Sequence, residues 1–231
     1  MPNVFITGAR TGIGLELVKT FADHGWYVRA ACRQTEVFPE DAKGGGVQVV
    51  ALDVLDPANI EHVAALLKDQ PIDVLLNVAG VFDSVSNTVD DDTLLTSMSD
   101  MTRVFQTNTI APRIIAEWLL PNLHLGTERL VVTISSVMGT FATLDDYHAC
   151  HWLYGASKAA VTYAMTAFAK TSPDVKSVLI HPGWVKTHMG GKDAPLDPAE
   201  VAEKIYLLIE NHKDRLPNGV FVDVDGSVME R

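Results

Sequence analysis

The segment YHACHWLYGASKAAV, residues 147–161, contains side chains that could act as acids, bases or metal ligands. Tyr154 and Lys158 lie four residues apart, so on a helix both side chains project from one face. A tyrosine with an ordinary pKa of about 10 is a poor acid–base group at neutral pH, and a neighbouring ammonium lowers that pKa by favouring the phenolate. The pair therefore predicts proton transfer, although the same spacing also occurs by chance on solvated helices.

The same segment offers metal-ligating residue types in His148, Cys150 and His151. A zinc site needs three or four such ligands, and no clear further cysteine or histidine lies within sequence reach. His181 and His188 could approach only through the fold. We therefore expect no metal site. We interpret these residues as a loop before the Tyr–Lys pair that shapes a substrate entrance, where oxidation of the Cys150 thiol could disturb the site.

Seven short runs of apolar and β-branched residues alternate with segments of helical periodicity. The predicted strands are residues 3–7, 27–32, 47–53, 73–77, 129–135, 176–181 and 219–223. The predicted helices are residues 13–24, 58–68, 99–120, 153–171 and 199–211. Asp56-Pro57 and Asp197-Pro198 mark two helix starts, with Asp as N-cap and Pro at the first helical position. Alternating elements with almost continuously apolar strands predict an α/β fold with a doubly wound, seven-stranded parallel sheet and helices on both faces.

Composition and charge argue against several classes of protein. The chain has 231 residues, of which 47% are hydrophobic, so it can bury a full core. A formal net charge of −11 without any Lys/Arg-rich run argues against a nucleic-acid or anionic-membrane surface. No apolar run approaches the roughly 18 residues of a membrane span, and MPNVFITG lacks the regions of a signal peptide. Cys32 and Cys150 have no CxxC spacing, so we expect reduced thiols in a cytoplasmic protein.

A glycine-rich turn, VFITGARTGIG, places Gly8, Gly12 and Gly14 between the first predicted strand and the first predicted helix. Glycines permit a tight turn and let backbone N–H groups approach a pyrophosphate at a helix N-terminus. This position favours nucleotide binding over a structural turn without a ligand. The GxxxGxG spacing after Thr7 differs from the GxGxxG of many dinucleotide-binding proteins.

The end of the second predicted strand, VRAACRQ, bears on the choice of nucleotide. A site selective for NAD usually has an acidic residue here, which hydrogen-bonds the ribose 2′-hydroxyl. This chain has Arg33 instead, with Arg10 in the glycine turn, and guanidinium groups suit a 2′-phosphate. We predict NADP(H) in preference to NAD(H). Two alternatives stay open: both arginines could be ordinary exposed side chains, and Glu36 is close enough in sequence to serve NAD(H).

Two further segments fit the same dinucleotide. ALDV, residues 51–54, would bring Asp53 to the adenine amino group and Val54 against the adenine ring. LNVAG, residues 76–80, ends a predicted strand with small residues, which lets the backbone pass beside the ribose.

The combination of TGxxxGxG, the serines of VVTISS, YGASK and a later Pro-Gly closely resembles the short-chain dehydrogenase/reductase family over nearly the whole chain. HPGWVKTHMGG and NGVFVDVDG resemble its C-factor-like and sniffer-type carbonyl reductase subgroup. This resemblance implies a single-domain Rossmann fold over residues 1–231. Family members commonly read NNAG at residues 77–80, where Val78 replaces the second Asn in this chain. They commonly have Asp at the position of His188. His188 is therefore either a titrating group beside the site or a plain surface histidine.

The resemblance also implies roles for the catalytic residues. Ser136 is the implied catalytic serine and would hold the substrate's carbonyl oxygen, while Tyr154 is the implied acid/base. Lys158 would bind the ribose and depress the pKa of the tyrosine. Asn108, within FQTNTIAP, matches the fourth catalytic residue of the family, which helps to carry a proton relay through water. Alternatively, Asn108 and Pro112 mark only a helix kink.

The implied cofactor and substrate sites draw on all these segments. The predicted cofactor contacts are Gly8, Arg10, Thr11, Gly12, Ile13, Gly14, Arg33, Asp53, Val54, Asn77, Ala79, Gly80, Tyr154, Lys158, Pro182, Gly183, Val185 and Thr187. The predicted substrate-pocket residues are Ser136, Met138, Cys150, Trp184, His188 and Met189. Residues 188–198 are expected to form a substrate loop, with Gly190, Gly191 and Pro195 as hinges.

The function predicted from these residues is the reversible reduction of an aldehyde or ketone to an alcohol, with hydride from NADPH and a proton from Tyr154. A nucleotide-sensing or signalling protein with little turnover is the alternative. The complete Asn108, Ser136, Tyr154 and Lys158 set favours the enzyme. The expected partners are a small carbonyl or alcohol substrate and further copies of the chain, in a homodimer or homotetramer packed through helices 99–120 and 153–171.

Overall fold

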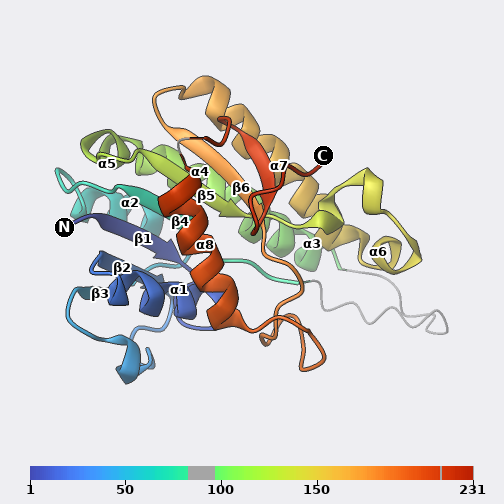
Figure 1. Ribbon diagram of the computed structural model, residues 1–231, viewed down its shortest axis with the longest axis horizontal. Coiled ribbons are helices and arrows are strands. Elements are labelled where there is room, and N and C mark those ends of the chain that lie inside the picture. Colours follow the sequence, from blue (N-terminus) through green and yellow to red (C-terminus); the bar gives the residue numbers. More distant parts are fainter. Residues whose placement is uncertain (83–96, 214, 231) are drawn as a thin grey trace.

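Seven mostly apolar strands form the centre of the protein in the computed structural model, which describes residues 1–82, 97–213 and 215–230 (Figure 1). The strands are β1 (Asn3–Thr7), β2 (Tyr27–Cys32), β3 (Val47–Ala51), β4 (Val74–Asn77), β5 (Leu130–Ile134), β6 (Lys176–His181) and β7 (Val220–Asp223). All neighbours pair in parallel, in the order β3-β2-β1-β4-β5-β6-β7. This confirms the predicted doubly wound sheet. Because the strands are parallel, the segments that follow them lie along one edge.

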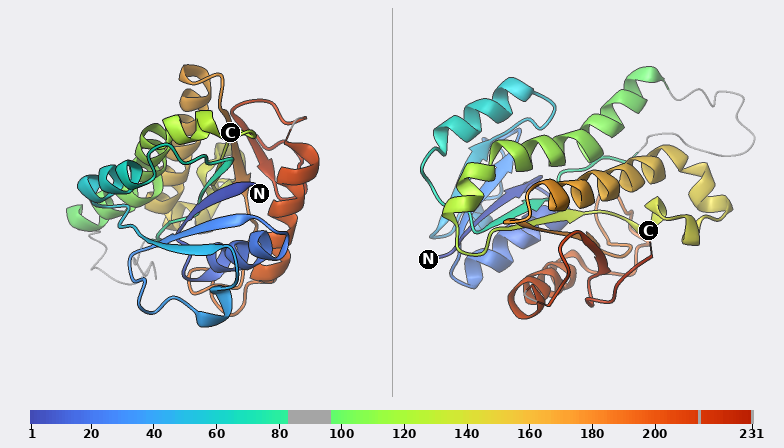
Figure 2. Two further views of the ribbon diagram at one scale, coloured as in Figure 1. Left: turned by 90° about the vertical axis from the view of Figure 1, so that its left-hand side faces the viewer. Right: turned by 90° about the horizontal axis from the view of Figure 1, so that it is seen from above.

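Helices cover both faces of the sheet, as Figure 2 shows. One face carries α1 (Gly12–Asp23) and α8 (Pro198–His212), and the other carries α2 (Pro57–Leu66), α4 (Ala111–Trp118) and α7 (Trp152–Thr171). Each face has its own buried apolar core, with Phe21 and Ile205 in the first and Ile115 and Phe168 in the second. Burial on both sides explains why the strands are apolar almost throughout. In the part of the chain that the structure describes, no helix is long and apolar enough to cross a membrane.

Both predicted Asp-Pro helix starts are confirmed. Asp56 accepts hydrogen bonds from the N–H groups of Ala58 (3.0 Å) and Asn59 (3.3 Å) at the start of α2. Asp197 accepts one from the N–H of Ala199 (2.8 Å) at the start of α8. A proline follows each aspartate, at a position where the helix needs no N–H donor. The second cap fixes the point at which α8 begins.

The single helix predicted for residues 99–120 is wrong. The structure has α3 (Met98–Phe105), a π-helical turn η2 (Gln106–Ile110), α4, and then α5 (Leu120–Leu125). Pro112 explains the break, because it has no N–H to donate to the carbonyl of Asn108 four residues earlier. Within the turn, the Ala111 N–H bonds to the Gln106 carbonyl instead. The helix distortion is therefore real, and it coincides with the residue predicted to be catalytic.

A second correction concerns the residues before Tyr154, which were predicted to form a loop. They form a short helix, α6 (Asp146–Cys150), preceded by the 3₁₀ turns η3 (Val137–Gly139) and η4 (Phe141–Thr143). Asp145 caps this helix by accepting a hydrogen bond from the His148 N–H (2.8 Å). Elsewhere in the chain, the 3₁₀ turn η1 (Glu40–Ala42) lies between β2 and β3 and is separate from this region. The chain therefore enters α7 from a second helix rather than from an open loop.

Asp73 joins the N-terminal ends of three strands. Its Oδ2 accepts a hydrogen bond from the Asn3 N–H (2.7 Å), and its Oδ1 accepts from the N–H (2.7 Å) and hydroxyl (2.9 Å) of Thr127. Burial alone would raise the pKa of Asp73, but these hydrogen bonds outweigh it and hold the pKa below its usual range. The ionised carboxylate therefore stabilises the fold above pH about 4, and this stabilisation is lost as the pH falls through the lowered pKa.

We expect Asp73→Asn to lower the free energy of unfolding at pH 7 by about 1–3 kcal/mol, because an amide cannot accept all three hydrogen bonds. Urea denaturation over a range of pH measures the effect, and the difference from the wild type should shrink as the pH falls. Asp174→Asn, at an exposed position, is the matched control and should behave as the wild type. A loss of stability that stays constant with pH would show that the carboxylate charge is not its source.

Candidate active site

The glycine turn after β1 packs against the turn after β4 with no room for side chains. Gly8 has φ of +67°, and a Cβ there would lie 2.8 Å from the N and Cα atoms of Ala79. A Cβ on Gly14 would lie 2.3 Å from the Gly8 carbonyl oxygen. The Thr7 hydroxyl oxygen joins the same turns by accepting from the N–H groups of Val78 (3.0 Å) and Ala79 (3.1 Å). The two predicted nucleotide-binding turns therefore form one tightly packed unit.

The N-terminus of α1 fits the pyrophosphate of a dinucleotide. Thr11 at its N-cap makes no side-chain capping hydrogen bond, whereas Asp56 and Asp197 cap α2 and α8. The first turn of α1 contains no acidic residue. The N–H groups and the dipole of such a terminus favour an anion. A Cβ on Gly12 (φ +57°) would lie 3.1 Å from Cγ2 of Thr187, so the loop that carries this predicted cofactor contact touches the same turn.

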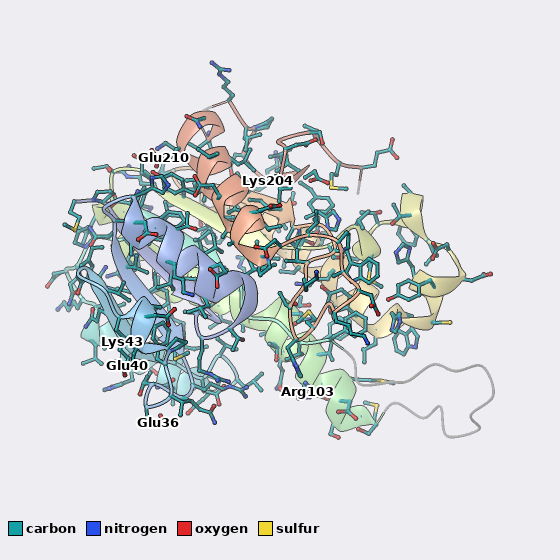
Figure 3. The ribbon with its side chains drawn as sticks, turned by 60° about the horizontal axis from the view of Figure 1, so that its bottom comes forward. Glu36, Glu40, Lys43, Arg103, Lys204 and Glu210 are labelled. Atoms are coloured by element: carbon teal, nitrogen blue, oxygen red, sulfur yellow. The ribbon has the colours of Figure 1, made fainter. Side chains whose placement is uncertain are left out.

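Arg10 and Arg33 lie near the end of β2. Arg33 is exposed and Arg10 is half-buried. Burial raises the pKa of the Cys32 thiol at the end of this strand, and the Arg10 guanidinium opposes that effect electrostatically. Glu36 is also exposed, on the connection between β2 and β3, and Figure 3 shows it at the rim of the molecule. Both arginines are therefore near the strand end where the sequence predicted contact with a 2′-phosphate.

Asp53 and Val54 follow β3, which ends at Ala51 rather than at residue 53 as predicted. The Asp53 N–H donates to Oδ1 of Asn59 (2.7 Å), and its carboxylate accepts from the Leu55 N–H (3.0 Å). Both Asp53 and Val54 are half-buried. These hydrogen bonds fix the backbone after β3, at the same edge of the sheet as the glycine turn.

Asn77 and Gly80, both predicted to contact the cofactor, have different surroundings. The Asn77 amide is buried and donates to the Pro112 carbonyl (3.2 Å), so its side chain braces β4 against α4. Gly80 lies at the sheet edge, where a Cβ would be 3.4 Å from Oδ1 of Asn108 and 3.9 Å from Nζ of Lys158. The turn after β4 therefore offers its backbone, rather than the Asn77 side chain, to a ligand at this edge.

Tyr154 and Lys158 lie in the first two turns of α7 and are both buried. Nζ of Lys158 donates to the Ile134 carbonyl (2.8 Å) and lies 5.5 Å from the centroid of the Tyr154 ring. Burial lowers the pKa of Lys158 to about 8. The lysine is therefore the point at which α7, the end of β5 and the turn after β4 meet.

Two glycines that the sequence analysis missed bring the Ser136 turn onto α7. A Cβ on Gly155 would lie 2.7 Å from the Met138 carbonyl oxygen, and a Cβ on Gly139 would lie 2.5 Å from the Ala159 nitrogen. Ser136 is buried at the start of η3, where its hydroxyl oxygen accepts from the Met138 N–H (3.2 Å). Any larger residue at either glycine would push this turn away from the helix that carries the Tyr–Lys pair.

Asn108 connects the segment after β4 to α7. Its Oδ1 accepts from the Val81 N–H (2.8 Å), and its Nδ2 donates to the Val81 carbonyl (2.8 Å) and to the Ser157 hydroxyl (3.0 Å). Ser157, the serine of YGASK, was also missed by the sequence analysis, and it donates to the Tyr154 carbonyl (2.7 Å). The structure thus links Asn108 to the helix of the Tyr–Lys pair through a single buried hydroxyl.

A row of rings leads from the surface to Tyr154. The Phe82 ring centroid lies 4.7 Å from that of Tyr154 and 4.8 Å from that of His151, and the Tyr147 and His151 centroids are 4.9 Å apart. Tyr147 is 62% exposed, whereas Tyr154 is 8% exposed. These rings form an aromatic wall beside the phenol. Phe82 was missed in the sequence, because one apolar residue after a strand carries no distinctive pattern.

The other residues of the 147–161 segment do not gather as metal ligands. His148 contacts the Thr143 carbonyl through Nδ1, which also lies 3.1 Å from a carboxylate oxygen of Asp145. Cys150 is a half-buried free thiol on α6. Within the described ranges, no group of three or more His, Cys, Asp or Glu residues is placed to hold a metal ion. The predicted pocket residue Met138 is half-buried in η3.

The loop after β6 carries the remaining predicted residues and is closed at its base. Val185 forms a parallel bridge with Leu196, and the Lys186 N–H donates to the Leu196 carbonyl (2.8 Å). Trp184 is exposed, and its indole N–H donates to the Gly190 carbonyl (2.7 Å). A Cβ on Gly190 would lie 2.1 Å from the Val185 carbonyl oxygen. His188 and Met189 lie at the exposed end of this loop.

A glycine-rich turn and a buried serine, tyrosine and lysine lie at one edge of a parallel sheet, which is where ligands bind in open α/β folds. The family model for short chain dehydrogenases matches residues 2–196, and the chain belongs to this family. The predicted resemblance, including that to the C-factor-like and sniffer-type subgroup, is confirmed.

Relatives in sequence and structure agree with this assignment. The chain is 35% identical to C-signal of Myxococcus xanthus over 162 residues, which cover 68% of this chain and 91% of that protein. The carbonyl reductase Sniffer of D. melanogaster is 26% identical, with a TM-score of 0.88 and full coverage of both chains. The NADPH-bound carbonyl reductase from chicken fatty liver is 28% identical, with a TM-score of 0.87 over 100% of this chain and 99% of that one.

Proposed function

We propose that the protein is an NADP(H)-dependent reductase that converts an aldehyde or ketone to an alcohol and catalyses the reverse reaction. The main support is the position of Lys158, whose ammonium lies between the Ile134 carbonyl, the turn of Gly80 and the ring of Tyr154. This arrangement joins the proposed acid/base to the proposed cofactor site. The carbonyl reductases among the solved relatives support the same substrate class.

The glycine turn fits a dinucleotide because it has no room for side chains at Gly8 and Gly14, so its backbone is what a phosphate would meet. Gly8, Gly12 and the N-terminus of α1 would hold the pyrophosphate, Arg10 and Arg33 the 2′-phosphate, and Lys158 the ribose. Bound NADPH supplies the hydride for the reduction. The loop after β6, with Thr187 against the glycine turn, would close over the nicotinamide end, and residues 188–198 would cover the substrate.

The protein's own residues handle the substrate oxygen and its proton. The Ser136 oxygen accepts from the Met138 N–H, so its own O–H can donate to the carbonyl oxygen and stabilise negative charge there. Tyr154 then donates its phenolic proton to the same oxygen. The Lys158 ammonium stabilises the phenolate that remains. Asn108 fixes the position of α7 relative to the segment after β4 through its hydrogen bonds to Val81 and Ser157. Burial of all four side chains strengthens these interactions.

The direct test is NADPH oxidation by the purified protein against a panel of aldehydes, ketones and diketones. We expect turnover of at least one carbonyl, together with formation of the corresponding alcohol. Tight NADPH binding without turnover of any carbonyl would contradict the reductase.

A signalling or sensing role is the second candidate, and the name of the bacterial relative C-signal favours it. A sensor needs the nucleotide-binding turns but has no use for a buried serine and a buried phenol at the same edge of the sheet. The two candidates differ in one measurable property. Ser136→Ala should abolish turnover in a reductase, while a sensor that works by binding NADPH would keep its function.

Arginine substitutions test the proposed cofactor preference. Arg33→Ala should lower the affinity for NADPH about 10- to 100-fold and leave that for NADH unchanged, because only NADPH loses a charged hydrogen bond to its 2′-phosphate. Fluorescence titration with both nucleotides measures this. Arg215→Ala, at an exposed arginine after α8, is the matched control. Equal weakening of both nucleotides would place Arg33 elsewhere than at the 2′-phosphate.

We also propose that the protein works as a homodimer or homotetramer in the cytoplasm. Ile110 and Trp118 near α4 and Tyr163 on α7 are large, exposed apolar or aromatic side chains on the helices expected to pack together. Both cysteines are free thiols, as a reducing compartment requires. Light scattering of the purified protein tests the assembly, and a monomer at micromolar concentration would contradict it.

A further inference from the structure

His181 ends β6 beside the turn that carries Ser136, and the proposed reaction has given it no role. The Ser135 N–H donates to the Ile180 carbonyl (2.8 Å), which keeps the chain after β5 next to the end of β6. One residue further on, the Val137 N–H donates to Nδ1 of His181 (3.4 Å). The imidazole is therefore the hydrogen-bond acceptor for the backbone immediately after Ser136.

This hydrogen bond fixes the protonation state of the ring. A ring nitrogen accepts a hydrogen bond only when it carries no proton, so the hydrogen bond from Val137 requires a neutral His181 ring with its proton on Nε2. Burial lowers the pKa of His181, which favours the neutral ring at neutral pH. Protonation would place an N–H at Nδ1 facing the Val137 N–H, and two donors at this distance repel each other.

The Ser136 turn has one support on each side. Towards α7, Gly155 lies close to the Met138 carbonyl and Gly139 lies close to Ala159. These contacts fix the distance between the turn and the helix. Towards β6, the support is the His181 ring. Ser136 caps this turn with its own hydroxyl, so a shift of the Val137 backbone also moves the hydroxyl.

We propose that His181 is a positioning residue for Ser136: the neutral ring holds the Ser136–Met138 turn in its active arrangement, and protonation of the ring releases it. The proposal rests on the reductase function proposed above. It predicts that turnover is lost at acidic pH when His181 is protonated, and this effect is separate from any effect of the Tyr–Lys pair at alkaline pH.

Within the described residues, a strand and a helix that pack against β6 each carry a charged group near its end. Asp223 of β7 is paired in register with His181, and its carboxylate favours the cation, opposing the effect of burial. The segment after β5 carries the neutral residues Ser135, Ser136 and Val137. α7 carries Lys158, whose ammonium is held by the Ile134 carbonyl, and beyond β7 the exposed Asp225 accepts from the Ser227 N–H. Asp223 is therefore the residue through which the titration of His181 can be changed without touching the site.

His181→Asn and His181→Phe separate positioning from packing. Asparagine can place Oδ1 where Nδ1 lies and does not titrate, so we expect this variant to keep kcat within about threefold at pH 8 and to lose the acidic limb of the pH profile. Phenylalanine keeps a ring of similar size but leaves the Val137 N–H without its acceptor, so kcat should fall about tenfold while NADPH affinity is unchanged. Asp223→Asn should move the acidic limb to lower pH.

The test that does not need turnover is NMR of isotope-labelled wild-type protein across the same pH range. We expect the Val137 amide and the Ser136 Cβ shifts to change with the same pKa as the His181 ring, and that pKa to match the acidic limb of kcat. Val137 and Ser136 signals that ignore the titration of His181, or an acidic limb that persists in His181→Asn, would overturn the proposal. If the signals follow His181 but no carbonyl is reduced, the reductase function fails and the positioning of Ser136 by His181 stands.

Discussion

Tyr154→Phe is expected to lower kcat by about 10²- to 10⁴-fold, which is the typical contribution of a positioned general acid. Phenylalanine keeps the ring that packs at 4.7 Å against Phe82 and removes only the hydroxyl. Because Lys158, rather than the phenol, is proposed to hold the ribose, the NADPH dissociation constant should change by less than about threefold. Pre-steady-state NADPH oxidation and a fluorescence titration measure the two effects separately.

The matched control is Tyr163→Phe. Tyr163 lies on the same helix but is 79% exposed, so removal of its hydroxyl should change neither turnover nor binding. If Tyr154→Phe instead abolished NADPH binding and the folded protein otherwise resembled the wild type, the phenol would be a cofactor ligand first. The assignment of Tyr154 as the acid would then be wrong.

Gly14→Ala is the second substitution with a large expected effect. A Cβ at this position would lie 2.3 Å from the Gly8 carbonyl oxygen, which belongs to the backbone and cannot rotate away. Overpacking of this kind costs about 1–3 kcal/mol, and we expect most of it to appear as distortion of the turn that is proposed to hold the pyrophosphate. NADPH affinity should therefore fall about 5- to 150-fold. Calorimetric titration with NADPH measures the loss, and thermal unfolding without nucleotide reports how much of the cost falls on the fold itself.

Gly44→Ala provides the control for Gly14→Ala. A Cβ at Gly44 meets no atom within 4 Å, and this glycine has an ordinary negative or extended φ, so alanine fits without strain. Its NADPH affinity and unfolding temperature should equal those of the wild type. Unchanged NADPH affinity in folded Gly14→Ala would show that the nucleotide does not depend on the shape of this turn.

The regular elements could be predicted because their apolar patterns are local. The ends of β1, β2 and β6 are those expected from the sequence, and the caps at Asp56 and Asp197 are in place. The long helix over residues 99–120 could not be predicted correctly, since apolar periodicity continues through a π turn without interruption. Pro112 was the available signal, but a missing N–H shows only that the helix is perturbed and does not give the form of the break.

The candidate site also has a part that could be predicted from the sequence and a part that could not. TGxxxGxG and YGASK could be located because each motif is contiguous, and the structure brings both to one sheet edge. The contacts that fix the site join distant segments, such as Gly155 with the Met138 carbonyl and Val137 with His181. They depend on which strand ends are neighbours and how closely the backbones approach, and no residue pattern within one segment contains that information.

The most direct test of the proposed reaction follows the hydrogen that leaves the nucleotide. NADPH carrying deuterium at C4 of the nicotinamide is incubated with the protein and a carbonyl that it turns over, and the alcohol is analysed by mass spectrometry. When the deuterium is on the reactive face, we predict one deuterium on the carbinol carbon for each molecule of NADPH consumed. With Tyr154→Phe, the labelled alcohol should form about 10²- to 10⁴-fold more slowly. Consumption of NADPH without deuterium in the alcohol, with either face labelled, would contradict direct hydride transfer and with it the reductase.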